Sequence, residues 1–163
     1  MERVFKTLQT KEAVHLLEYV KTYLEQRDSI ELLIGCDSQN QGRETVYAIV
    51  LGLYTPGKGA HVLFSRFETP REKDTVSRLL NEVWFATEVA EYLRAELGLF
   101  HTTIDIDLNP DPKFKSNQAL ASAVGIVTGM GYKVRHKGNC PMMTYAADDL
   151  VKHRKKRRKK ETV

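Results

Sequence analysis

Acidic side chains stand at the ends of two predicted buried strands. The apolar run Leu32–Cys36 is typical of a strand covered on both faces, and Asp37 follows it with no turn signal between. A second strand is expected from His101, and it carries Asp105 and Asp107 on one face, Asp107 being nearer the edge. A buried carboxylate is costly unless a cation pairs with it or coordinates it. The two strand ends therefore predict a site that needs a cation.

Two predicted helices carry further acidic candidates. Glu82 and Glu88 lie in a long helix, with Glu82 on the flank of its apolar stripe, and Asp148 and Asp149 lie at similar angles in the last helix. Three or four carboxylates in one place repel one another, and oxygen-only ligands suit Mg²⁺ or Mn²⁺. Two such ions about 4 Å apart activate a water and stabilise the leaving oxygen of a phosphoryl displacement. The pattern thus predicts metal-dependent chemistry on a phosphodiester.

Each carboxylate also has an ordinary structural explanation. Asp37 can cap nearby amides at the start of a loop, and Asp107 can be a turn residue before Asn-Pro. Glu82 can be a surface residue that pairs with Arg78, one helical turn earlier. Asp148 can be a solvated helix residue. These alternatives stay open at the level of single residues.

Hydrophobic periodicity predicts one α/β domain over residues 1–151. An amphipathic helix is expected over about residues 10–26, with Thr10 as its N-cap. A βββαβαβα order follows, with expected bounds 30–37, 45–54, 60–68, about 70–97, 101–107, 114–130, 132–136 and a last helix from 141. The first three strands should form an antiparallel meander, and helical crossovers place the fourth strand parallel to the first, with helices on both faces. Functional groups are then expected at the carboxyl ends of the strands, where Asp37 and Asp107 are each the last residue.

Charge is divided unevenly along the chain. The 163 residues include 25 Lys and Arg and 21 Asp and Glu, but eight of the basic residues lie within 152–160. Residues 1–151 therefore carry 17 basic and 20 acidic side chains, a net charge of −3. We expect residues 152–163 to form a disordered basic tail suited to sequence-independent phosphate contact, the alternative being a tail that only aids solubility. With no apolar run of membrane-spanning length and no signal-peptide pattern, a cytoplasmic location with no membrane partner is expected.

The order of the acidic positions resembles the ribonuclease H-like superfamily, and within it the sequence looks like the YkuK-like branch over about residues 30 to 150. The matching segments are Gly35–Gln39, Asp107–Pro110, Lys115–Asn117, Gly125–Tyr132 and Ala147–Asp148. The resemblance implies a ribonuclease H-like mixed five-stranded sheet flanked by helices, here with an extra N-terminal helix. It also implies a site for Mg²⁺ or Mn²⁺ whose ligands and catalytic residues are Asp37, Glu82, Asp107 and Asp148.

The resemblance selects among the alternatives that geometry leaves open. It favours Asp107 over Asp105, Asp148 over Asp149 and Glu82 over Glu88; Asp105, Asp149 and Ser38 are kept as alternates. Ser38 is more readily explained as a residue that shapes the loop after Asp37. One loop departs from the branch, which usually reads Lys-Pro-Asp-Ala where residues 137–141 read Lys-Gly-Asn-Cys-Pro, so an acidic residue is missing near Asn139.

Nucleic acid is the expected partner. Lys115, Ser116 and Asn117 begin a predicted helix beside Asp107, where free amides and the positive helix end favour phosphate, although a helix cap explains them equally well. In the tail, Lys155, Arg157 and Arg158 are expected phosphate contacts. Three functions are compatible with this sequence: a metal-dependent nuclease acting on RNA, an RNA–DNA hybrid or DNA; a catalytically silent nucleic-acid-binding module of the same fold; or an interaction protein whose tail docks on an acidic partner.

Overall fold

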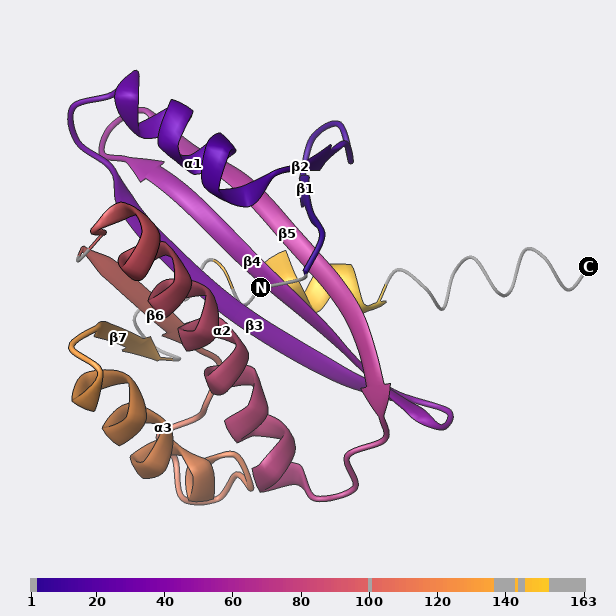
Figure 1. The fold of residues 1–163 in the computed structure, drawn as a ribbon. Helices are drawn as coiled ribbons and strands as arrows, with labels where there is room; N and C mark the ends of the chain where they lie inside the picture. Colours follow the sequence, from indigo (N-terminus) through magenta and orange to yellow (C-terminus); the bar gives the residue numbers. More distant parts are fainter. Residues whose placement is uncertain (1–2, 100, 137–142, 144–145, 153–163) are drawn as a thin grey trace, which may run out of the picture.

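A seven-stranded mixed sheet organises the fold in a computed structural model that describes residues 3–99, 101–136, 143 and 146–152 (Figure 1). The strand order is β2-β1-β5-β4-β3-β6-β7. The strands are β1 (Phe5–Thr7), β2 (Ala13–Val14), β3 (Glu31–Gln41), β4 (Glu44–Thr55), β5 (Gly59–Pro70), β6 (Thr102–Ile106) and β7 (Lys133–His136). The helices are α1 (Leu16–Glu25), α2 (Thr75–Leu97) and α3 (Asn117–Gly129), and residues 146–152 form a further helical segment.

The meander of β3, β4 and β5 is the centre of the sheet. β3 and β4 pair antiparallel from Glu31↔Tyr54 to Gln41↔Glu44, and the turn between them places Gly42 at a φ of 62°, which a residue with a side chain rarely adopts. β6 joins β3 in parallel, and β7 joins β6 in parallel. The parallel pairing of β3 with β6 ends at Gly35↔Asp105, whereas β3 itself continues for six residues along β4. The end of that parallel pairing is the edge where the acidic residues were predicted to meet.

Helices cover both faces of the sheet. Figure 1 shows α1, α2 and α3 on one face, where the larger apolar core lies, and the short helical segment 146–152 behind the strands. On that second face Met143, Ala147, Leu150 and Val151 pack against apolar side chains of β3, β4 and β5. Gly52 of β4 makes this packing possible, because a Cβ there would lie 2.7 Å from Met143 Sδ. No helix of the described residues is long and apolar enough to cross a bilayer.

The α/β class, the mixed sheet and the helices on both faces are confirmed, but the sheet has seven strands, not five. Of the two additional strands, β2 replaces the first part of the helix expected over 10–26, and β1 precedes that range. β1 pairs with the edge of β5 at Lys6↔Phe64, and β2 folds back onto β1. The Thr10 hydroxyl contacts Thr7 and Glu12 in the connecting loop, so it does not cap a helix, and α1 begins only at Leu16.

Two further expected bounds are wrong for related reasons. The first meander strand does not end at Asp37, because antiparallel pairing with β4 carries it to Gln41. The long helix does not begin at Pro70–Glu72, since β5 extends through Pro70 as an edge of the meander. α2 instead begins after Asp74, whose Oδ2 accepts a 2.7 Å hydrogen bond from the Ser77 backbone N–H. Its end at Gly98 agrees with the prediction.

Candidate functional site

Asp37 lies within β3, and Asp107 directly follows the end of β6, so neither is the last residue of its strand, as had been expected of both. Each follows by two residues the last paired position, Gly35 on β3 and Asp105 on β6. Both are intermediate in exposure. Both carboxylates therefore stand at the carboxyl edge of the parallel strands. Although Asp37 is not the last residue of β3, it stands where β6 stops pairing, which gives the same juxtaposition.

Glu82 reaches this edge from the middle of α2. It is buried, with 5% of its surface exposed, and its Oε1 accepts a 2.5 Å hydrogen bond from the Ser38 hydroxyl. Glu82 is therefore not a surface residue, although it does pair with Arg78 one turn earlier, at 3.5 Å. Among the described residues its hydrogen bonds use Oε1 only, which leaves Oε2 for another ligand.

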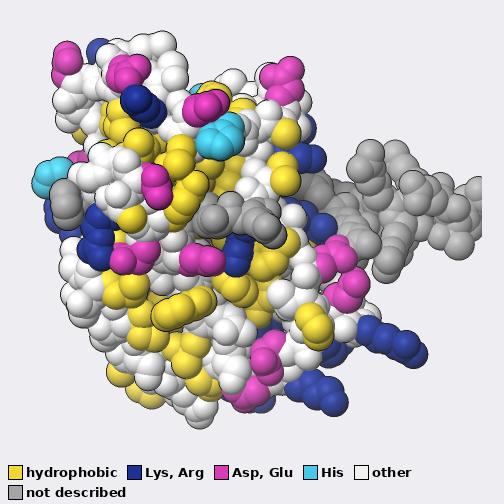
Figure 2. Space-filling model, viewed as in Figure 1, with side chains coloured by type: hydrophobic (Ala, Val, Ile, Leu, Met, Phe, Trp, Pro, Cys, Tyr) yellow, Lys and Arg dark blue, Asp and Glu magenta, His cyan; other side chains and the backbone are white. Residues whose placement is uncertain are grey.

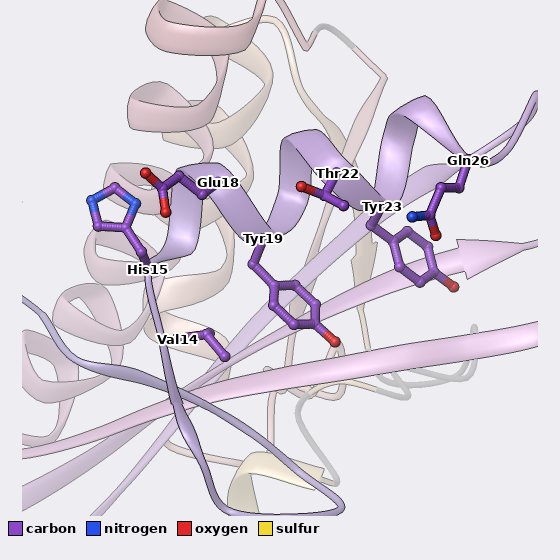
Figure 3. Close-up of a pocket in the computed structure, with 7 residues that line it drawn as sticks. All are labelled: Val14, His15, Glu18, Tyr19, Thr22, Tyr23 and Gln26. Carbon is purple, nitrogen blue, oxygen red and sulfur yellow. The ribbon is translucent and has the colours of Figure 1, made fainter.

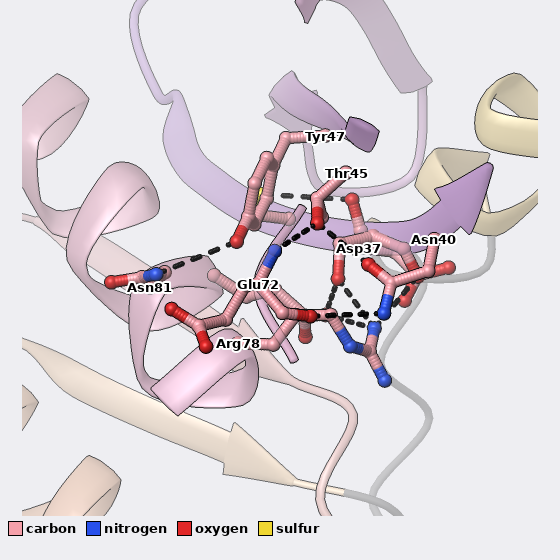
Figure 4. Close-up of polar contacts among 10 residues, drawn as sticks. Asp37, Asn40, Thr45, Tyr47, Glu72, Arg78 and Asn81 are labelled. Carbon is pink, nitrogen blue, oxygen red and sulfur yellow. Dashed lines mark hydrogen bonds and ion pairs between the residues drawn. The ribbon is translucent and has the colours of Figure 1, made fainter. Parts of the chain in front are cut away.

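A small polar network fixes the start of α2 against β3 and β4. The Asn40 amide donates to the Glu72 carbonyl at 3.0 Å, the Thr45 hydroxyl donates to Asn40 Oδ1 at 2.6 Å, and the Glu72 backbone N–H donates to Thr45 Oγ1 at 2.8 Å. Figure 4 shows this network beside Asp37, with Arg78 reaching from α2 toward the strand. The network sets the position along β3 at which Arg78 and Glu82 contact Ser38, the residue after Asp37.

The last helical segment brings the fourth carboxylate. Asp148 pairs with Lys152 one turn later, and its side chain is 40% exposed. The segment is held to the sheet by Ala147, Leu150 and Val151, all buried. Asp149, the alternative to Asp148, is exposed. The negative charge of Asp148 contributes to the rise in the pKa of Asp37.

The carboxyl groups of Asp37, Glu82, Asp107 and Asp148 interact electrostatically. Burial raises the pKa of Asp37 to about 7; the charges of Asp148 and Asp107 add to this rise, whereas the Ser38 backbone N–H and Arg78 oppose it. Burial also raises the pKa of Glu82 well above its ordinary value, and Asp37 and Asp107 contribute. Asp37 is therefore the carboxyl group that interacts with all three others, and their charges together with burial disfavour its own charged form.

A comparison with known protein families agrees with this architecture: the ribonuclease H-like family matches residues 14–152. The chain belongs to the ribonuclease H-like family. The match covers every strand and helix from α1 onward and the whole carboxylate edge. A search among curated proteins finds no match.

The donor set of this ribonuclease H-like domain fits a hard divalent cation in its chemistry. All four side chains offer oxygen, which Mg²⁺ and Mn²⁺ prefer, and they carry charge that a cation would neutralise. As the side chains stand, no three potential metal ligands of the described residues are arranged closely enough to hold an ion. Asp148 forms an ion pair with Lys152, and Glu82 contacts both Arg78 and Ser38. A bound ion would therefore have to draw the carboxylate oxygens of Asp148 and Glu82 toward it.

Asp105, the alternative to Asp107, is committed elsewhere. Its side chain has no exposed surface, and it accepts hydrogen bonds from Arg135 Nε at 2.7 Å and Arg135 Nη2 at 2.9 Å. The backbone N–H of Met143 donates to the same carboxylate at 3.0 Å. Asp105 thus joins β6 and β7 to the start of the last helical segment, and its oxygens serve structure.

The predicted phosphate-binding residues fall into two groups. Ser116 Oγ accepts from the Asn109 backbone N–H at 3.3 Å, and the Asn117 amide donates to the carbonyls of Asn109 and Pro110, so both brace the loop that follows Asp107. Lys115 is exposed beside them. Lys155, Arg157 and Arg158, and the loop around Asn139, lie outside the described residues.

A pocket of about 440 Å³ lies away from this edge, along α1. Figure 3 shows Tyr19 and Tyr23 on one side of the helix, and the Tyr19 hydroxyl hydrogen-bonds His61 Nε2 at 2.5 Å. Burial lowers the pKa of His61. Among the residues that line this pocket, Glu18 is the one carboxylate, so the pocket does not offer a second cluster of acidic side chains.

Sequence reasoning assigned no functional role to Arg78. The only signal was its spacing of four residues from Glu82, which indicates a helix salt bridge. The structure shows that it also contacts Ser38, and that contact depends on how α2 lies on β3.

Proposed function

We propose that this ribonuclease H-like protein is a divalent-metal-dependent nuclease that hydrolyses phosphodiester bonds in RNA, an RNA–DNA hybrid or DNA. The observation that carries the proposal is the electrostatic coupling of four carboxyl groups, from β3, α2, the end of β6 and the last helical segment, in which Asp37 interacts with each of the others. Such a concentration of negative charge is costly unless a cation compensates it. The family match supports a nucleic-acid-related role for the fold.

Mg²⁺ or Mn²⁺ is the cofactor of this proposal, held by Asp37, Glu82, Asp107 and Asp148. A bound divalent cation would supply Lewis-acid charge to the phosphoryl group and ease deprotonation of the attacking water. The chain's own residues prepare the site for it. The Ser38 backbone N–H favours the charged form of Asp37, and Ser38 and Arg78 do the same for Glu82.

Nucleic-acid affinity in the proposal comes mainly from the basic tail. On the face that carries the helices, acidic and basic side chains are interspersed (Figure 2), so that face offers no strong single-sign field to a polyanion. The tail follows directly on Lys152, which pairs with Asp148. Lys155, Arg157 and Arg158 would therefore hold a phosphate backbone close to the carboxylates. Membership of the YkuK-like branch and a cytoplasmic location belong to the same proposal.

A second candidate is a catalytically silent nucleic-acid-binding module. It is favoured by the cations already present, Lys152 on Asp148 and Arg78 on Glu82, and by the lack of three described ligands in an ion-holding arrangement. In this alternative the basic side chains replace the metal as counter-ions.

Cleavage with Mn²⁺ separates the two candidates. Labelled RNA–DNA hybrid, RNA and single-stranded DNA are incubated with wild-type protein, Asp37→Asn and Asp148→Asn, with the exposed neighbour variant Asp149→Asn as the matched control. The nuclease proposal expects cleavage by wild type and Asp149→Asn and its loss in the other two. Absence of cleavage, or equal cleavage by Asp37→Asn, would defeat it, and nucleic-acid binding that survives both substitutions would favour the silent module.

A further inference from the structure

Arg78 is anchored by one of its nitrogens. Nη1 donates to the Ser38 carbonyl at 3.0 Å and to Ser38 Oγ at 2.6 Å, and it lies 3.5 Å from Glu82 Oε1. Its Nε and Nη2 make no hydrogen bond with any residue in the described part of the chain, and 21% of the side chain is exposed. The Arg78 guanidinium is thus held by Nη1, while its Nε and Nη2 donors stay available to a ligand.

Arg135 shows what a structurally satisfied arginine looks like in the same domain. Its Nε and Nη2 both bind Asp105, at 2.7 Å and 2.9 Å, in the side-on geometry that carboxylates and phosphates accept. At Arg78 the same two nitrogens, Nε and Nη2, have no hydrogen-bond partner among the described residues. Its contact with Glu82 uses only Nη1, at the outer limit of a hydrogen bond.

The position of Arg78 determines what can use those donors. The side chain lies between Ser38 and Glu82, and its positive charge acts on Asp37. An anion approaching this edge meets several carboxylates, so it needs a fixed cation beside them. The two parallel N–H donors of a planar guanidinium match the paired oxygens of a phosphodiester. The hydrogen bonds among Asn40, Thr45 and Glu72 fix the start of α2 and so keep the Arg78 guanidinium in place.

We propose that Arg78 binds a backbone phosphate of nucleic acid through Nε and Nη2 and so places the phosphodiester beside Asp37. This assignment rests on the proposed nuclease function and adds a substrate-binding residue to it. The competing explanation is that Arg78 only neutralises the buried charge of Glu82. If so, replacing both residues together would restore all that the single replacement loses.

The two explanations make different predictions for the binding of nucleic acid in the absence of metal. Binding of a labelled RNA–DNA hybrid, duplex DNA and single-stranded RNA is measured in EDTA over a series of salt concentrations. The variants are Arg78→Gln, Arg78→Lys and the double variant Arg78→Gln/Glu82→Gln, each checked by thermal unfolding. Arg27→Gln is the matched control, since it removes the same charge from an exposed residue that lies seven or more residues of β3, roughly 20 Å, from Ser38.

We expect Arg78→Gln to weaken binding about tenfold or more, and to reduce the slope of log K against log salt by about 0.7 to 0.9. Arg78→Lys should recover part of the affinity, the double variant none of it, and Arg27→Gln should leave the slope unchanged. Full recovery in the double variant, or equal slopes for Arg78→Gln and Arg27→Gln, would overturn the assignment while leaving the nuclease proposal intact. Failure of the wild-type protein to bind any of the three nucleic acids would overturn both the Arg78 assignment and the nuclease proposal. Binding of inorganic phosphate alone that depends on Arg78 would overturn the assignment to nucleic acid and identify a site for free phosphate instead.

Discussion

Replacing Asp37 by asparagine should make the metal-free protein more stable while removing its proposed activity. In the folded chain Asp37 is partly buried beside Asp107 and Asp148, which raises its pKa from 3.8 to about 7. Above that pH the group carries a charge for which the folded environment is less favourable than water. An amide of the same shape does not carry that charge.

The sign and size of the effect follow from the pKa. Because the folded-state pKa exceeds the unfolded one, the folded protein binds the proton more tightly, and stability is lost as pH rises from 3.8 to about 7. At 1.36 kcal/mol for each unit, the difference corresponds to about 4 kcal/mol at most. Since Asp37 keeps some exposed surface, we expect Asp37→Asn to gain about half of that, about 2 kcal/mol, at slightly alkaline pH.

Urea unfolding in EDTA at about pH 5 and about pH 8 measures this gain directly. The stability advantage of Asp37→Asn should grow with pH, whereas Asp149→Asn, an exposed neighbour of Asp148, should follow the wild type at both values. Saturating Mn²⁺ should then stabilise the wild-type protein and leave Asp37→Asn unchanged. An Asp37→Asn variant that is equally or less stable than wild type at alkaline pH would refute the reasoning, because it would mean that Asp37 already has a sufficient counter-ion.

Three other predictions concern the elements that hold the site. Asp105→Ala should lower the free energy of unfolding by about 3 kcal/mol, since it leaves Arg135 without its buried partner; urea titration measures this, and a loss below that of a surface Asp→Ala change would contradict it. Gly52→Ala should cost about 1–3 kcal/mol, because its Cβ would lie 2.7 Å from Met143 Sδ, whereas Gly125→Ala, with nothing within 4 Å, should be neutral or stabilising in thermal unfolding. Deleting residues 153–163 should weaken nucleic-acid binding and flatten its salt dependence while some Mn²⁺-dependent cleavage persists; complete loss of cleavage at high protein concentration would argue for a docking role of the tail.

The fold was largely predictable where periodicity is strong. The apolar runs of β3 and β4, the stripe of α2 with Gly98 at its end and the small residues of α3 each indicated their element. The N-terminus was not predictable in the same way, since β1 and β2 are three and two residues long, and β1 pairs with the edge of β5 while β2 pairs with β1. Short strands of that kind have no periodicity of their own to detect.

The candidate site was predictable as a set of residues but not as a set of contacts. Alternation along a strand cannot separate Asp105 from Asp107, and the difference depends on Arg135, thirty residues later. Equally, Glu82 was expected near a strand end, but its hydrogen bond with Ser38 depends on how α2 lies on β3, which the Asn40–Thr45–Glu72 network fixes. Contacts between distant segments follow from the packed structure and leave little local trace in the sequence.

Calorimetric titration with Mn²⁺ tests the central claim most directly, because it does not depend on knowing the substrate. We expect the wild-type protein to bind Mn²⁺, and Asp37→Asn, Glu82→Gln, Asp107→Asn and Asp148→Asn each to weaken binding at least about tenfold, whereas Asp149→Asn should not. A wild-type protein that binds no Mn²⁺, or variants that all bind it as the wild type does, would contradict the claim that these four carboxylates form a metal site.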